Sequence, residues 1–103
     1  MANRARRYKL HEKLKAICEN VYFQPPNNAQ IKYPCIIYNE DVGRVEHADN
    51  RLYLNTDSYM VTVIDKNPDS EIPGILMETF PMIRKGKPYR ADNLNHYPHT
   101  LYF

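Results

Sequence analysis

The first stretch of the chain carries apolar residues at helical spacing. Four of them lie four, three and four residues apart, which places them on one face of an α-helix: Leu10, Leu14, Ile17 and Val21. The prolines at 25–26 end this pattern, because proline lacks the backbone N–H that a helix needs. We therefore predict one amphipathic helix over residues 4–21, within an N-terminal segment 1–23.

Beyond residue 31 the pattern changes to short runs of β-branched and aromatic residues, which are typical of strands. These runs cover 33–38, 44–54, 59–64, 89–93 and 97–103. The run 59–64 is largely apolar at both odd and even positions, so both faces of this strand are expected to be covered. We expect a helix of the same chain on one face and a second subunit on the other.

A second helix is predicted over about 70–80, where apolar residues recur at helical spacing until Pro81 ends them. The basic residues 83–88 are predicted to form an exposed loop. The order of elements predicts an α+β fold in a single domain, 1–103, whose sheet lies within 31–103. We expect a mainly antiparallel sheet of about four to five strands, with the N-terminal helix and the second short helix packed on one face.

Charge is distributed unevenly along the chain. Net charge is +2, but residues 1–15 hold six basic groups and one acid, a net of +5, and the other 88 residues hold eight basic and eleven acidic groups, a net of −3. The basic segment is either a solvated helix face or a contact for something anionic, such as phosphate or an acidic neighbouring subunit. The candidate contact residues for DNA, a ring lumen or a partner are Arg4, Arg6, Arg7, Lys9, Arg84, Lys85 and Lys87.

The basic clusters lack the interleaved aromatic residues of a base-stacking platform. They suit contact with the DNA backbone, whose strength depends on salt rather than on sequence. We therefore expect DNA proximity without sequence-specific binding.

Residues that carry catalysis are sparse. Ser58 and Ser70 lie in turn contexts and neither is next to a histidine, and three isolated glycines cannot form a phosphate-binding loop. His96 and His99 are three residues apart on a predicted strand, so their side chains should point to opposite faces. We expect no enzyme activity, no cofactor and no metal site.

The two cysteines and the hydropathy pattern add two further expectations. Cys18 and Cys35 form no C-x-x-C motif, so both are expected to be buried free thiols. No run approaches the ~20 apolar residues of a membrane-spanning helix, so we expect no membrane contact.

Tyrosine is abundant, with nine residues. Tyrosine combines apolar area with a polar tip and is enriched at protein interfaces. The rings either pack the sheet against its own helices or cover a subunit boundary. The candidate subunit-interface residues are Tyr33, Tyr38, Tyr53, Tyr59, Tyr102 and Phe103.

Five segments together resemble those of a known family. They are YPCIIY at 33–38, ADN at 48–50, YMVTVI at 59–64, NPDS at 67–70 and YRADNLNHY at 89–97. The combination is similar to small tail-terminator proteins of long-tailed bacteriophages, also called tail-completion or head–tail joining proteins. The segments are strands and turns, so no catalytic residues are carried over.

The resemblance implies an α+β structural virion protein of the tail or neck, assembled in the host cytoplasm. Such proteins form a ring, expected here to be a hexamer, at the head-proximal end of the tail tube. The ring stops polymerisation of the tail tube protein and joins the tail to a head connector or stopper protein, and genomic DNA passes through it. Another neck component of similar size is also open. The alternative is a small cytoplasmic nucleic-acid-binding or regulatory module that uses the basic N-terminal segment.

Overall fold

The computed structural model describes residues 3–41 and 57–103, with side chains from Ala5 onward. It has two helices and a mixed, mostly antiparallel sheet of six strands, which confirms the predicted α+β class. The strand expected at 44–54, the ADN segment at 48–50 and Tyr53 lie outside the described residues.

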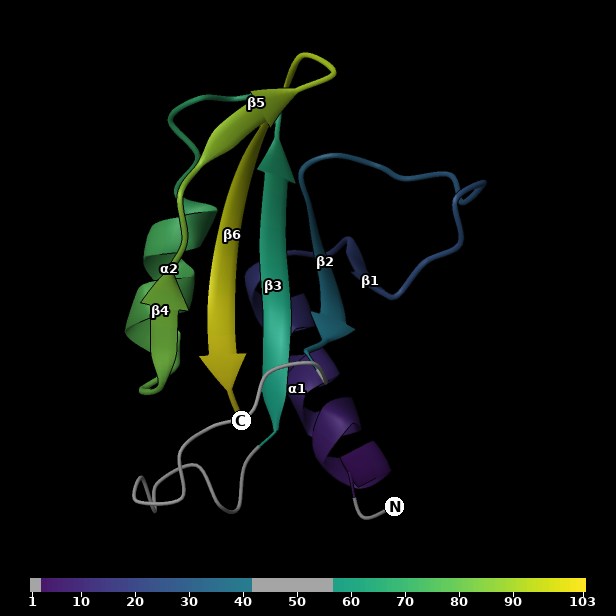
Figure 1. Ribbon diagram of the computed structural model, residues 1–103, viewed down its shortest axis with the longest axis vertical. Helices are drawn as coiled ribbons and strands as arrows, with labels where there is room; N and C mark the ends of the chain where they lie inside the picture. Colours follow the sequence, from purple (N-terminus) through teal and green to yellow (C-terminus); the bar gives the residue numbers. More distant parts are fainter. Residues whose placement is uncertain (1–2, 42–56) are drawn as a thin grey trace.

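The elements follow the order helix, three strands, helix, three strands (Figure 1). They are α1 (Asn3–Ile17), β1 (Val21–Phe23), β2 (Cys35–Glu40), β3 (Ser58–Asp65), α2 (Ile72–Thr79), β4 (Ile83–Lys85), β5 (Tyr89–Ala91) and β6 (Leu94–Tyr102). The strand order is β1-β2-β3-β6-β4, and β5 also pairs with β6. Only β1 and β2 run parallel; every other pair is antiparallel.

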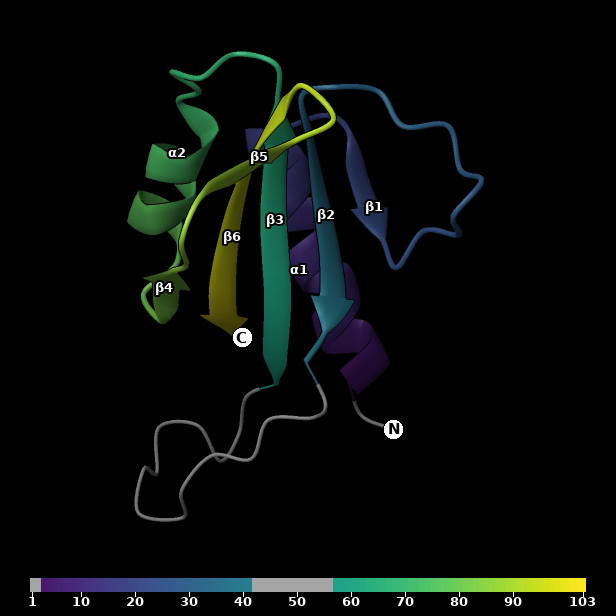
Figure 2. The same ribbon diagram turned by 45° about the horizontal axis from the view of Figure 1, so that its top comes forward.

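In this register the odd-numbered residues of β3 and β6 point to the same face of the sheet. This face holds the core. Both helices contribute side chains to this core, and Figure 2 shows α1 behind β2 and β3 with α2 at the flank beside β6. This confirms that both helices lie on one face. The buried cluster includes Leu10 and Leu14 of α1, Leu76 of α2 with Phe80 after it, Ile36 and Tyr38 of β2, Tyr59, Val61 and Val63 of β3, and Leu101 of β6.

The middle of the opposite face of the sheet carries Ile37, Met60, Thr62, Pro98 and Thr100, which we call the open face. Their side chains are half-buried. Further along the same side of the sheet, Cys35 and Ile64 are buried. Neither helix of the described residues lies on this face (Figure 1). The pairing of β3 thus gives it a second face that carries apolar side chains, as expected. That a second subunit covers this face stays a prediction.

The N-terminal helix is shorter than predicted, because residues 21–23 form β1 instead of its last turn. The helix ends where the Cys18 N–H donates to the Leu14 carbonyl, and the Ile36 N–H then donates to the Asn20 carbonyl at 2.8 Å. Val21 is buried in β1, and a longer helix would also have placed it on the buried side. Its spacing therefore did not distinguish a helix from a strand. The β-branched and aromatic residues of β1 favour the strand.

The segment 83–88, predicted as a loop, begins with the short strand β4. Ile83 is half-buried and lies opposite Leu101 of β6, which fixes this segment to the sheet. The strands β1 and β4, each of three residues, raise the sheet to six strands. The last hairpin turns at Asp92 and Asn93, both at positive φ, so β5 ends before and β6 begins before the bounds of the predicted runs 89–93 and 97–103.

Two glycines give a matched pair of stability predictions. A Cβ on Gly74 of α2 would meet nothing within 4 Å, so Gly74→Ala is expected to raise the free energy of unfolding by about 0.5–1 kcal/mol. A Cβ on Gly86 would lie 3.1 Å from the Pro98 carbonyl oxygen, so Gly86→Ala should lower it. Thermal melts test both, and a lower Tm for Gly74→Ala would contradict this account of α2.

Candidate functional site

Three of the predicted interface rings are buried by the chain itself. Tyr38 and Tyr59 are 0% exposed and Tyr102 is 6% exposed. They offer no surface to a neighbour, so the interface prediction is wrong for these three residues. The physical reason is their register: Tyr38 and Tyr59 both point to the face that the helices cover.

The other predicted interface rings have different positions. Tyr33 is exposed, at 36%, and follows the loop that leads into β2. Phe103 is half-buried and its ring meets Phe80 edge-on at 6.1 Å. Tyr33 is therefore the predicted interface ring that remains accessible among the described residues.

Tyr38 is the centre of an aromatic cluster. Its ring lies 4.9 Å from Phe23 and 6.1 Å from Tyr59, and its hydroxyl is 2.7 Å from Nδ1 of His11. Burial raises the pKa of Tyr38, and burial together with nearby carboxylates raises the pKa of Tyr59 to about 12. Burial, aided by Lys15 and Arg7, lowers the pKa of His11. All three shifts favour the uncharged form of these side chains, which suits their packing in the interior.

Two cations of the basic segment are engaged inside the fold. The Arg7 guanidinium lies 4.2 Å from the centre of the Phe23 ring and donates to the Tyr38 hydroxyl at 3.5 Å. Arg6 approaches the carboxylate of Asp57 at 3.8 Å. Lys9 stays exposed. Arg6 and Arg7, two of the predicted DNA contacts, thus already have partners within the chain.

The hollow beside Arg7 was missed by the sequence analysis. Arg7, Tyr8, His11 and Glu12 line an open depression of about 280 Å³ on α1. The residues follow one another at helical spacing, which is the sequence pattern that could have grouped them. The lining offers a guanidinium, an imidazole, a phenol and a carboxylate, which together form a mixed polar surface.

Arg84, Lys85 and Lys87 form a second, separate basic group. All three are exposed, on β4 or just after it. Strand order places β1 and β4 at opposite edges of the sheet, and Arg7 packs on the β1 side (Figure 1). The fold therefore does not bring the two predicted basic clusters together.

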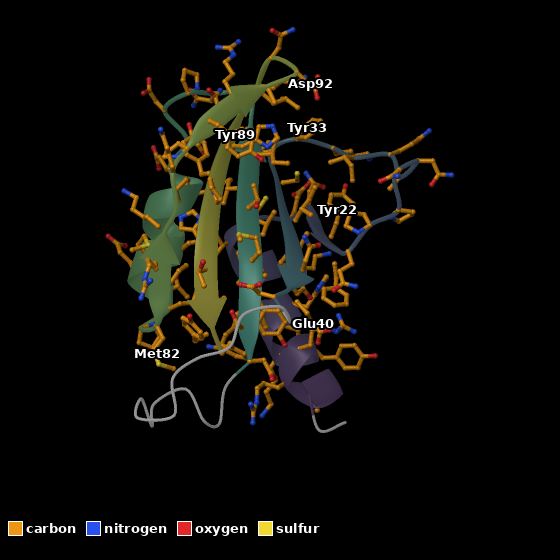
Figure 3. All side chains as sticks on the ribbon, viewed as in Figure 1. Tyr22, Tyr33, Glu40, Met82, Tyr89 and Asp92 are labelled. Carbon is orange, nitrogen blue, oxygen red and sulfur yellow. The ribbon has the colours of Figure 1, made fainter. Side chains whose placement is uncertain are left out.

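The sheet end beside β5 carries an exposed aromatic group that lies outside the predicted interface residues. Tyr89 is 55% exposed and stacks on His96, with ring centres 4.6 Å apart and planes 8° from parallel. Figure 3 shows Tyr33 and Tyr89 at the same end of the molecule, near Asp92. This end of the open face therefore combines aromatic area with polar tips.

Metal and thiol chemistry find no support in the described part of the chain. Residues 3–41 and 57–103 contain no group of three His, Cys, Asp or Glu side chains placed to hold a metal ion. His96 lies opposite Ile64 and His99 opposite Val61, so they point to opposite faces as predicted. Cys18 and Cys35 are buried free thiols, as predicted. Burial raises the pKa of Cys35 to about 12, which makes it a poor nucleophile.

Neither described helix has the length and apolar character needed to cross a membrane. Comparisons of the chain with protein-family models, with curated proteins and with solved structures found no match. Functional inference therefore depends on the surfaces of the molecule.

Proposed function

We propose that this chain is a structural virion protein, a tail terminator that forms a ring at the head-proximal end of a phage tail tube. The ring, a hexamer, stops tube polymerisation and joins the tail to the head connector. The α+β fold supports this proposal, because it is the fold that the resemblance implies. Four of the five resembling segments lie in the described residues, where they contribute to β2, β3, the turn before α2 and the β5–β6 hairpin, all of them structural elements.

The observation that carries the proposal is the open face. Its side chains mix apolar and hydroxyl groups on the three central strands, and no described helix covers them. A 103-residue chain buries only roughly 60–70% of its unfolded surface. A face of this kind on a small protein suits contact with another subunit. In the proposed assembly it packs against a neighbouring component of the tail or neck.

Genomic DNA passes through the proposed ring. Arg84 lies opposite Thr100, on the side of the open face, and Lys87 is exposed beside it. Cations at this edge would contact phosphate without reading bases. This contact is expected to weaken as salt concentration rises.

Particles made without this protein test the proposal. We expect overlong tails that are not attached to heads, seen by electron microscopy, and rescue by the wild-type chain. Thr62→Arg should fail to rescue, because it places a long cation at the centre of the open face. Since Thr62 is only half-buried, the variant is expected to fold.

Gln30→Arg is the matched control, because it adds the same side chain at an exposed loop position away from the open face. It should rescue tail length and attachment. Melting curves of both purified variants establish that they fold. Normal tails joined to heads in particles that lack the protein would contradict the proposed function.

A further inference from the structure

The outer side of α2 is acidic around an exposed apolar residue. Glu71, Ile75 and Glu78 follow i, i+4, i+7 spacing, so they share one side of the helix. Ile75 is 41% exposed and both carboxylates are exposed. No Lys or Arg occurs between residues 67 and 82. We call these three residues the acidic face of α2.

The outer side of α1 has the same spacing and the opposite charge. Lys9, Lys13 and Ala16 follow i, i+4, i+7 spacing, and all three are exposed. We call them the basic face of α1. The small side chain of Ala16 leaves room for an apolar group from a partner, in the same way that Ile75 presents one.

One end of each helix carries charge that opposes the local helix dipole, whereas Lys15 in the last turn of α1 and Glu71 at the N-cap of α2 agree with it. The first turn of α1 contains Arg4 and Arg6 and no acid, although this end of a helix favours anions. Glu78 lies in the last turn of α2, which holds no basic residue although this end favours cations. Residues 3–41 and 57–103 contain no salt-bridge partner for Lys9, Lys13, Glu71 or Glu78. These charges therefore suit a partner outside the chain.

We propose that this partner is a second copy of the chain, whose basic face of α1 receives the acidic face of α2. Figure 2 shows α2 at one flank of the molecule and α1 behind β2 and β3, and within the described residues no ion pair joins the basic face of α1 to the acidic face of α2 in one copy. A contact between two different surfaces is heterologous, and its repetition closes a ring when the rotation allows it. The inference rests on the proposed ring and names its lateral contact, while the open face is left for the tube or the connector.

Charge reversal on each face gives a sharp test. Lys9→Glu with Lys13→Glu makes both faces acidic, and Glu71→Lys with Glu78→Lys makes both basic. Each double variant alone should associate about tenfold more weakly than wild type, because like charges would face each other. An equal mixture should recover assembly, because every junction between unlike variants again joins opposite charges.

Light scattering at low and high salt measures association, which should be strongest at low salt because ions screen these charges. The control is Lys32→Glu with Arg90→Glu, which makes the same change in net charge as the lysine reversal at exposed positions outside both faces. This control should associate as wild type does. Ile75→Ser provides a variant without charge change, and it should weaken association while leaving the melting temperature nearly unchanged.

Three results would overturn the proposed contact. They are a wild-type chain that stays monomeric at low salt, reversed variants that associate as well as wild type, and a mixture no better than its parts. If either reversed variant does not fold, unchanged association of Ile75→Ser overturns it instead. The tail phenotype tests the terminator role separately, so attachment defects combined with any of these results would retain the proposed function and reject this contact.

Discussion

Replacing Tyr38 with alanine is expected to lower the free energy of unfolding by about 3–5 kcal/mol, the range for removing a large buried ring. Tyr38 is fully buried and contacts Phe23, Tyr59 and His11. Domains of this size have a total stability of about 5–15 kcal/mol. The variant should therefore lie near the limit of folding, as measured by urea unfolding.

Tyr8→Ala is the matched control, because Tyr8 is 53% exposed and its ring is contacted from one side by Arg7. It should cost less than about 1 kcal/mol. Tyr38→Phe should fall between the two, since it keeps the ring and leaves His11 without its hydroxyl partner. Equal stabilities of Tyr38→Ala and Tyr8→Ala would contradict the position of Tyr38 at the centre of the cluster.

Stability is expected to fall as pH is lowered from 7 to 5. His99 is 1% exposed and its Nδ1 has no hydrogen-bond partner. Burial lowers its pKa below the usual 6.5, although hydrogen bonds with the backbone of Val61 and Tyr97 oppose this shift. Below pH 6.5 the unfolded chain binds a proton at this residue before the folded protein does. Between pH 6.5 and the pKa of His99 in the folded protein, this residue lowers the free energy of unfolding by up to about 1.4 kcal/mol for each pH unit.

Urea unfolding at pH 8, 7 and 5 tests this expectation. The midpoints at pH 8 and 7 should differ little on account of His99, and the midpoint at pH 5 should be lower. His99→Leu should reduce the difference, and the lowered pKa of His11 leaves a remainder of the same sign. An NMR titration of the His99 ring gives an independent readout, and an ordinary pKa there would refute the explanation.

The elements with strong local patterns were predictable from the sequence. Helix α2 follows from its apolar spacing and from Pro81, and the central position of β3 follows from apolar residues on both of its faces. In each case the information lies within one element and needs no knowledge of its partner.

The elements that depend on a partner were not predictable in the same way. Val21 fits a buried position in a helix or in a strand, and only pairing with Ile36 decides between them. β4 is a strand because β6 lies beside it. The burial of Tyr38 and Tyr59 also depends on which sheet face the helices occupy, since a tyrosine ring suits either an interior or an interface.

The candidate surfaces were likewise predictable only where a single element determines them. The charged residues of α1 and α2 were visible in the sequence, and their spacing was sufficient to place them on helix faces. The separation of Arg6 and Arg7 from Arg84 and Lys85 required the strand order. Engagement of Arg7 by Phe23 required the contact between α1 and β1.

The edge of the sheet formed by β4 helps the protein to avoid fibrous aggregation. An unpaired edge strand can template the addition of strands from other molecules without limit. Here the edge strand β4 has three residues, and two of them, Arg84 and Lys85, are exposed cations. A second β4 brought alongside would place like charges together. Growth through backbone hydrogen bonding is thereby discouraged, which suits a protein whose proposed role is to end a polymer.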